Sequence, residues 1–262
     1  MLAARFALAA LALGSAGWAD TAGSFTAPSY NIASIVNSAT NGPGALAPNT
    51  IATIYGTDLS FNTRAIASSD LSAGVLPRVL GGVQVYIGGV QANLYFVSPH
   101  QINFLIPSIL RPGSAVVYVV REGVAGPPVS VMLLDVAPGL FELNPNTIVA
   151  THADGSVVTD DAPAAAGEVV VLYAVGLGHT LPDSPQGQIA NGPWPIAHTD
   201  LRVLVGGEAV DPARILYAGA TPGFAGLYQI NVRLPDQLAP DPEVRIALED
   251  QTSKAALKIP TR

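Results

Sequence analysis

The amino-acid sequence predicts an all-β protein made of two tandem β-sandwiches that follow a cleaved signal peptide. Three observations support this fold class. Apolar residues recur at every second position in several segments, a set of short motifs occurs twice in the same order, and Gly or Pro interrupts the chain at short intervals. Strict alternation is typical of a strand with one buried face. Many short strands between turn residues favour sandwiches.

The composition excludes several classes of protein. The chain has 262 residues, of which 49% are hydrophobic and 12% charged, whereas average soluble domains carry about 25% charged residues. Disorder is therefore excluded, because disordered chains are poor in apolar residues. The absence of cysteine excludes disulfides and thiolate chemistry. A net charge of −7 disfavours a nucleic-acid partner, since binding to phosphates requires a basic surface.

Residues 1–19 have the pattern of a secretory signal peptide. Arg5 precedes an apolar segment at 6–13, and Gly17-Trp18-Ala19 places small residues where a signal peptidase cleaves. The alternative, a membrane anchor, is disfavoured because the segment is too short to cross a hydrocarbon layer of ~30 Å. We therefore expect a protein that does not span the membrane and is exported, as a secreted, periplasmic or cell-surface protein.

Internal repeats divide the mature chain. Ile87-Gly88-Gly89 recurs as Val205-Gly206-Gly207, QINFLIP at 101–107 recurs as QINVRLP at 229–235, and TIYGTDL at 53–59 resembles VLYAVGL at 171–177. A repeated set of motifs in one order indicates two copies of one unit. We predict a first sandwich over 20–141 and a second over 142–262.

The repeated segments have the alternation of half-buried strands. Val83, Val85 and Ile87 alternate with polar or aromatic residues, and the two Gln-Ile-Asn segments alternate in the same way. Each is therefore predicted to bury one face. The Gly-Gly pairs after 87 and 205, and Asp154-Gly155, are typical of hairpin turns.

The segment PNTIATIYGTDL at 48–59 resembles the opening of an IPT/TIG domain, which has an immunoglobulin-like fold. The chain also resembles a Solibacter-type family of uncharacterised secreted C-terminal modules. That similarity covers IVNSA at 35–39, LGGV at 80–83, VSPHQIN at 97–103, APGLF at 137–141, AVGLG at 174–178 and PGFAGLYQIN at 222–231. The resemblance implies tandem immunoglobulin-like sandwiches and carries no assigned activity.

No catalytic pattern is visible in the sequence. The histidines are His100, His152, His179 and His198, and no two have the spacing of a metal-binding pair on one strand or helix. A Gly-x-Ser-x-Gly nucleophile motif is also absent. We therefore expect a protein that is not an enzyme and that needs no cofactor.

The densest acidic cluster comprises Asp160, Asp161 and Glu168, close to Asp154. Calcium prefers several carboxylate oxygens, so these residues are candidates for a calcium site. The spacing lacks the acidic loop of known calcium motifs. We favour solvated loop charge and predict no bound metal.

The Gln-Ile-Asn repeats place Gln101 with Asn103, and Gln229 with Asn231, on one strand face each. One interpretation is a polar row that binds a sugar or a partner strand. The other is that these amides satisfy nearby backbone groups. We favour the second interpretation, because a binding site is rarely needed twice in identical form.

The irregular segment 181–199 holds the candidate ligand-binding residues Trp194, Gln186, Gln188 and Asn191. An aromatic face beside amides suits a sugar or a protein surface, and long loops are often functional. The alternative is that Trp194 fills one end of the second sandwich. A second candidate loop spans 61–76 and contains Arg64 and Asp70.

Three classes of function follow. The first is a secreted or cell-surface, non-catalytic interaction module whose partner is an unknown protein or glycan. The second is a carbohydrate-binding accessory protein that uses Trp194 and the neighbouring amides. The third, an extracellular hydrolase, has the least support, since no nucleophile–base pair or metal constellation is visible.

Overall fold

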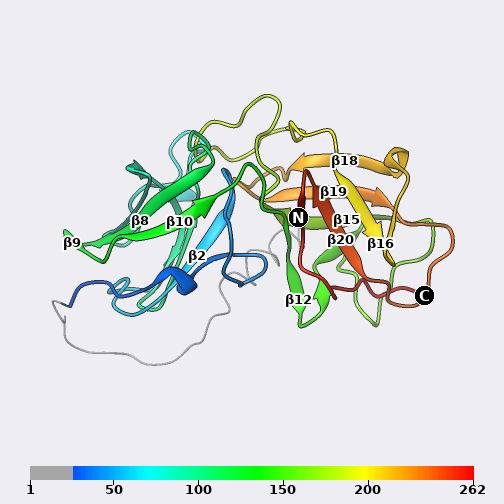
Figure 1. The fold of residues 1–262 in the computed structure, drawn as a ribbon, viewed down its shortest axis with the longest axis horizontal. Helices are drawn as coiled ribbons and strands as arrows, with labels where there is room; N and C mark the ends of the chain where they lie inside the picture. Colours follow the sequence, from blue (N-terminus) through cyan, green and yellow to red (C-terminus); the bar gives the residue numbers. More distant parts are fainter. Residues whose placement is uncertain (1–25) are drawn as a thin grey trace.

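The computed structural model describes residues 26–262, which form antiparallel β-sheets arranged as two sandwiches (Figure 1). The predicted all-β, tandem immunoglobulin-like sandwich fold is confirmed. The signal-peptide prediction, on residues 1–19, lies outside the described residues. The helical elements of the described part are 3-10 turns at Ile32–Ser34, Ser68–Asp70 and Pro212–Arg214. Within that part, no helix is long and apolar enough to cross a membrane.

The first sandwich consists of two facing sheets. One sheet has the order β1-β2-β7-β6-β3, and the other has the order β10-β8-β4-β5 with β9 also paired to β8. The strand bounds are β1 Ile35–Asn37, β2 Ile51–Tyr55, β3 Arg64–Ala65, β4 Val83–Ile87, β5 Val90–Gln91, β6 Asn93–Val97, β7 Gln101–Leu105, β8 Gly113–Arg121, β9 Val124–Ala125 and β10 Val129–Leu133.

Strand β4 follows the predicted alternation, and strand β7 does not. Val83, Val85 and Ile87 are fully buried in the first core, and the Gly-Gly turn joins β4 to β5. In β7 all five residues are buried, so the prediction of one exposed face is wrong for this strand. Its polar face is covered as well, and there Asn103 Oδ1 accepts hydrogen bonds from Thr53 at 3.1 Å and Gln101 at 2.9 Å.

The second sandwich also has two main sheets. Their orders are β11-β15-β19-β18, with β14 on β15, and β17-β16-β20-β21, and β12 and β13 form a separate hairpin. The bounds are β11 Gly139–Leu140, β12 Glu142–Asn144, β13 Thr147–Ile148, β14 Ala150–His152, β15 Val169–Val175, β16 Arg202–Val205, β17 Glu208–Ala209, β18 Ile215–Ala220, β19 Tyr228–Arg233, β20 Val244–Leu248 and β21 Gln251–Thr252.

The two sandwiches carry a β-bulge at the same place. In the first, the register of β6 against β7 shifts between Leu94 and Phe96, and Phe96 lies opposite Asn103. In the second, the register of β18 against β19 shifts between Ile215 and Tyr217, which lies opposite Asn231. Bulges re-aim the side chains around them. The two Gln-Ile-Asn strands therefore occupy equivalent positions, and Tyr217 takes the position of Phe96.

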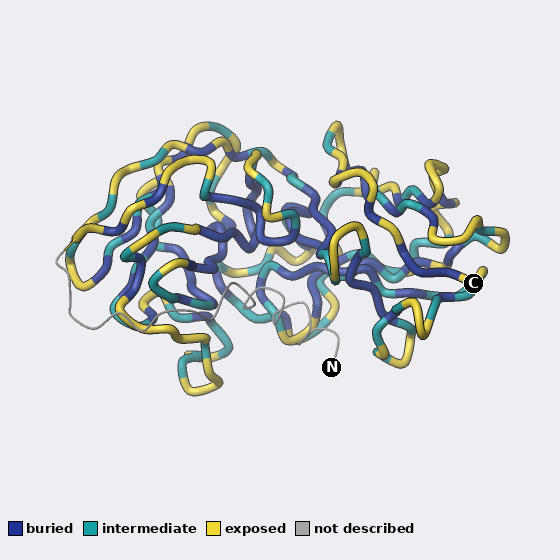
Figure 2. Tube along the Cα trace, turned by 90° about the horizontal axis from the view of Figure 1, so that it is seen from below, coloured by how far each residue is buried: buried dark blue, intermediate teal, exposed yellow. Residues whose placement is uncertain are grey.

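A third apolar cluster joins the two sandwiches, and in Figure 2 the buried backbone runs through both halves. The cluster contains Ala39, Ile51, Leu76, Tyr95 and Leu105 from the first part and Phe141, Val149, Tyr173, Val175, Ala225 and Leu227 from the second. We call this cluster the seam. Strand β11 lies just before the predicted boundary, yet it pairs with β15 of the second sandwich. The division of the chain at 141/142 stays a prediction.

Candidate functional site

A groove of about 490 Å³ opens on the outer surface of the second sandwich, over strands β18 and β19. This volume lies within the range of small-molecule sites, about 300–1,000 Å³. The groove is lined by Asn191, Gly192, Pro193, Tyr217, Pro222, Gln229 and Asn231. Strand residues and loop residues thus meet in one concave surface.

The floor of the groove is the amide face of β19. Tyr228, Ile230 and Val232 are buried in the core, so the alternation turns Gln229 and Asn231 outward, where both are half-buried. Gln229 Nε2 donates to Asn231 Oδ1 at 3.0 Å. The remaining donors and acceptors of two amides are thereby held in a fixed orientation beside the groove.

The aromatic wall of the groove depends on a glycine. The Tyr217 side chain reaches forward along its own strand, and its hydroxyl donates to the carbonyl of Ala220 at 3.0 Å. A Cβ on Gly219 would lie 2.4 Å from Tyr217 Oη and 2.7 Å from Cζ. The phenol therefore lies directly over Gly219, in space that a side chain at that position would fill.

The groove carries no formal charge, because none of the residues that line it is acidic or basic at neutral pH. Burial raises the pKa of Tyr217 above its ordinary value of 10.0, so the phenol stays protonated at neutral pH. The site therefore offers an aromatic face, two proline walls and neutral hydrogen-bonding groups.

The structure separates the four predicted residues of segment 181–199. Asn191 is exposed and lines the groove, and Trp194 is half-buried. Gln186 and Gln188 point toward the first sandwich instead, where Gln186 Nε2 donates to the carbonyl of Gln91 at 2.9 Å and Gln188 Nε2 to that of Gly74 at 3.2 Å. Those two amides connect the sandwiches.

The backbone of Trp194 positions the groove. Ala220 N donates to Trp194 O at 2.9 Å and Ile196 N to Ala218 O at 3.0 Å, so residues 194–196 lie alongside β18. The bridge places Pro195 opposite Gly219. This pairing fixes Asn191 and Pro193 next to Tyr217, which is how the loop and the strand face combine into one site.

The acidic candidates do not form a cluster with metal-binding geometry. Asp160 and Asp161 are exposed, whereas Glu168 accepts hydrogen bonds from Ala165 N at 2.8 Å and from His152. Across residues 26–262, no three histidine or carboxylate side chains gather where they could hold a metal ion.

The other histidines have local partners. His100 Nδ1 lies 3.1 Å from the carbonyl of Gly56, in a turn. His179 pairs with Asp183 at 2.9 Å and His198 with Glu249 at 3.2 Å. The second candidate loop, 61–76, is held by an ion pair between Arg64 and Asp70.

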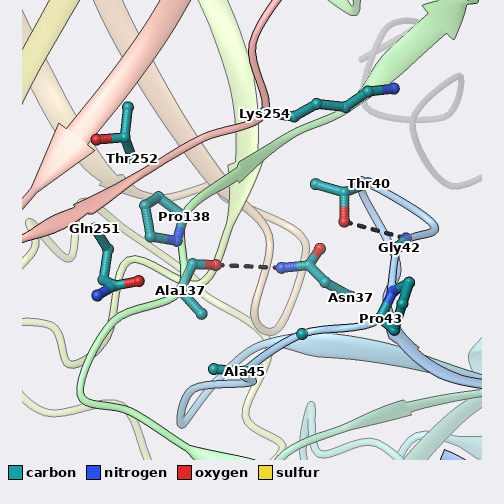
Figure 3. Close-up of a pocket in the computed structure, with 11 residues that line it drawn as sticks. Asn37, Thr40, Gly42, Pro43, Ala45, Ala137, Pro138, Gln251, Thr252 and Lys254 are labelled. Carbon is teal, nitrogen blue, oxygen red and sulfur yellow. Dashed lines mark hydrogen bonds between the residues drawn. The ribbon is translucent and has the colours of Figure 1, made fainter. Parts of the chain in front are cut away.

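A second cavity, of about 370 Å³, lies where the two sandwiches meet (Figure 3). Asn37 Nδ2 donates across it to the carbonyl of Ala137 at 3.2 Å, and Asn37 Oδ1 accepts from Ala39 N at 2.9 Å. Lys254 also lines it and pairs with Glu142 at 2.8 Å. The Asn37–Ala137 bond spans the cavity, and the other two contacts each lie within one sandwich, so these polar groups already have partners in the joint between the sandwiches.

Sequence reasoning missed Tyr217 and Gly219. The available signal was weak: a Tyr-Ala-Gly segment at 217–219 lies ahead of the second Gln-Ile-Asn motif, in the position that Phe-Val-Ser at 96–98 occupies ahead of the first. Gly in a strand often marks a close approach. Only the strand register shows that the close approach is made by the tyrosine two residues earlier.

Comparisons with known proteins give distant structural likenesses. The SGBP-B of a Bacteroides ovatus mixed-linkage glucan utilization locus, in complex with a heptasaccharide, is 10% identical, with 83% of this chain and 43% of that chain covered and a TM-score of 0.34. The surface glycan-binding protein PbSGBP-B from Prevotella bryantii is 10% identical, with 80% and 36% covered and a TM-score of 0.27. The tandem Ig repeats of Dlar are 12% identical, with 91% and 96% covered and a TM-score of 0.22.

The chain spans less than half the length of the first two of these structures. The sequence matches no protein-family model and no curated protein. Membership of the Solibacter-type family therefore stays a prediction.

Proposed function

We propose that this protein is a non-catalytic binding module, exported from the cell, that holds a polysaccharide chain in the groove over β18 and β19. The observation that carries the proposal is the phenol of Tyr217, which lies over Gly219 and lines the groove together with the amides of Gln229 and Asn231. Secretion, periplasmic residence or surface attachment would each give the groove access to extracellular glycan.

The chemistry of the groove fits a sugar. An aromatic face supplies a large, rigid contact area for the apolar face of a pyranose ring, at low cost in conformational entropy. Amide groups provide both donors and acceptors, so they can satisfy hydroxyls, which are donors and acceptors themselves. Asn191 contributes a third amide from the loop that lines the groove. The groups are all neutral hydrogen-bonding groups, which supports binding without catalysis.

Affinity electrophoresis through gels that contain soluble polysaccharides, followed by calorimetry with those that retard the protein, tests the proposal. We expect Tyr217→Ala to weaken binding about tenfold or more, which corresponds to about 1.4 kcal/mol. Tyr118→Ala is the matched control, because Tyr118 is a half-buried tyrosine that stacks on Tyr86 on the first sandwich, away from the groove. Equal binding by wild type and Tyr217→Ala would contradict the proposal.

A protein partner is the second candidate function, and the apolar rim of the groove favours it. Pro193, Pro222 and the Tyr217 ring form a surface of the kind that binds extended peptide segments. This candidate requires that no polysaccharide retards the protein and that a purified partner binds in a Tyr217-dependent way.

A further inference from the structure

The groove is uncharged although the chain around it is acidic. Its lining consists of amides, prolines, a glycine and a phenol whose pKa burial raises, while the chain carries 19 acidic and 12 basic residues. A net negative charge lowers the local concentration of anions near a protein surface. An anionic ligand would therefore meet repulsion on approach and no cation in the groove.

The nearest cation on the same strand face already has partners. Arg233 follows Asn231 by two residues, and its Nη1 donates to the carbonyl of Gly167 at 3.2 Å. Arg214 has the largest effect in lowering the pKa of Asp236, and the charge of Arg233 lowers that pKa further. The guanidinium of Arg233 therefore lies close to the Asp236 carboxylate. The charge of Arg233 is thus partly balanced outside the groove and does not line it.

We infer that the groove selects neutral polysaccharides and excludes polyuronates and other polyanionic glycans, an inference that rests on the proposed function. A carboxylate placed beside Tyr217 would lose hydration without gaining a charged partner, which is costly. Hydroxyls placed there exchange water for the amides of Asn191, Gln229 and Asn231. Recognition by neutral groups also predicts an affinity that depends little on salt.

Matched ligand pairs test this selectivity. Each neutral polysaccharide that binds, such as dextran, glucomannan or a cellulose ether, is compared with its carboxymethylated form and with a hydroxyethylated form of equal substitution. We expect the carboxymethylated form to bind at least about tenfold more weakly and the hydroxyethylated form to bind like the parent. The hydroxyethylated form separates the effect of charge from that of bulk.

An introduced cation tests the physical cause. Asn191 is exposed in a loop, so Asn191→Lys places a positive charge at the rim without disturbing the core. This variant should gain affinity for the carboxymethylated form, and the gain should disappear at high salt. Asn191→Gln, which adds length without charge, is the control and should gain nothing.

The outcomes separate the inference from the proposed function. Equal, Tyr217-dependent binding of neutral and carboxymethylated chains would overturn the selectivity and leave the binding function standing. Absence of any gain in affinity of Asn191→Lys for the carboxymethylated form would likewise overturn the selectivity and leave the binding function standing. Failure of every polysaccharide to bind would overturn both.

Discussion

The phenol oxygen of Tyr95, in the first sandwich, makes two hydrogen bonds to a single residue of the second, Ala225. It donates to the Ala225 carbonyl at 2.6 Å and accepts from the Ala225 amide at 2.8 Å. Tyr95 is 4% exposed and belongs to the apolar seam. One side chain therefore satisfies both backbone groups of a buried residue across the junction.

Tyr95→Phe should weaken the docking of the two sandwiches. The substitution keeps the ring and leaves two buried backbone groups without that partner, which costs about 1–3 kcal/mol. Denaturant unfolding followed by probes in each sandwich should show the two transitions moving apart.

Tyr30→Phe is the matched control for this prediction. Tyr30 makes the same pair of bonds within the first sandwich, from Val119 N at 2.8 Å and to Pro127 O at 2.7 Å. Its loss should lower the stability of the first sandwich without affecting the seam. If Tyr95→Phe behaves like Tyr30→Phe, the bonds to Ala225 do not couple the sandwiches.

Gly226→Ala should disrupt the seam through a clash. Gly226 has φ +70°, and a Cβ there would lie 2.2 Å from Leu105 Cδ1 and 2.5 Å from the carbonyl oxygen of Asn49. Gly223 has φ +87° with open space around its Cβ position. Both substitutions incur left-handed strain, so the difference between them isolates the clash, which we expect to cost about 1–3 kcal/mol. Equal melting temperatures for the two variants would contradict this close packing.

Ile230→Asp should unfold the second sandwich. Ile230 is fully buried in the core of that sandwich, and an unpaired buried carboxylate costs more than about 4 kcal/mol. Asn231→Asp, on the opposite face of the same strand, should change the free energy of unfolding by only about 1 kcal/mol. Circular dichroism and denaturant titration of both variants check the alternation of β19. A cooperatively folded Ile230→Asp protein would refute it.

The ion pair of His152 and Glu168 predicts a pH dependence of stability. The hydrogen bond with Glu168 raises the pKa of His152 above 6.5. The contribution of protonated His152 to the free energy of unfolding is therefore fully present below pH 6.5, and it is lost as the pH rises through the raised pKa. Burial acts to raise the pKa of Glu168, but hydrogen bonds from Ala165 N and His152 outweigh it and lower that pKa below 4.5.

The Glu168 contribution is accordingly present above pH 4.5 and is lost as pH falls through the lowered pKa. The pair therefore stabilises the fold most between pH 4.5 and 6.5. Urea midpoints across pH, compared between wild type and His152→Gln, should differ most in that window. A difference that is constant with pH would show that the pair contributes no charge-dependent stability.

Local alternation was sufficient to predict strands such as β4 and β19, because each buries one face within its own sandwich. It failed for β7, because the far side of that strand is covered as well: Leu105, on the polar face, belongs to the seam with the second sandwich. Such cover depends on contacts between residues more than 100 positions apart, such as the Tyr95–Ala225 bonds.

The candidate site was predictable only in pieces. Asn191 and the Gln229–Asn231 pair each stood out as polar features, but nothing local shows that a loop and a strand 40 residues apart share one groove. Gln186 and Gln188 carry the amide groups that a sugar site uses, which is why the sequence made them candidates. In the structure, segment 181–199 crosses the junction, and both side chains bind backbone carbonyls of the first sandwich instead.

The pairing of Trp194–Ile196 with β18 also affects how copies of this protein behave when crowded. An outermost strand with unpaired amides is a template for another chain, and edge-to-edge growth of this kind leads to fibrils. Here the neighbouring segment pairs with the amide of Ala220 and the carbonyl of Ala218, and Pro195 has no amide hydrogen to offer at the bridge. At high local concentration, molecules should therefore remain separate along this side of the sheet.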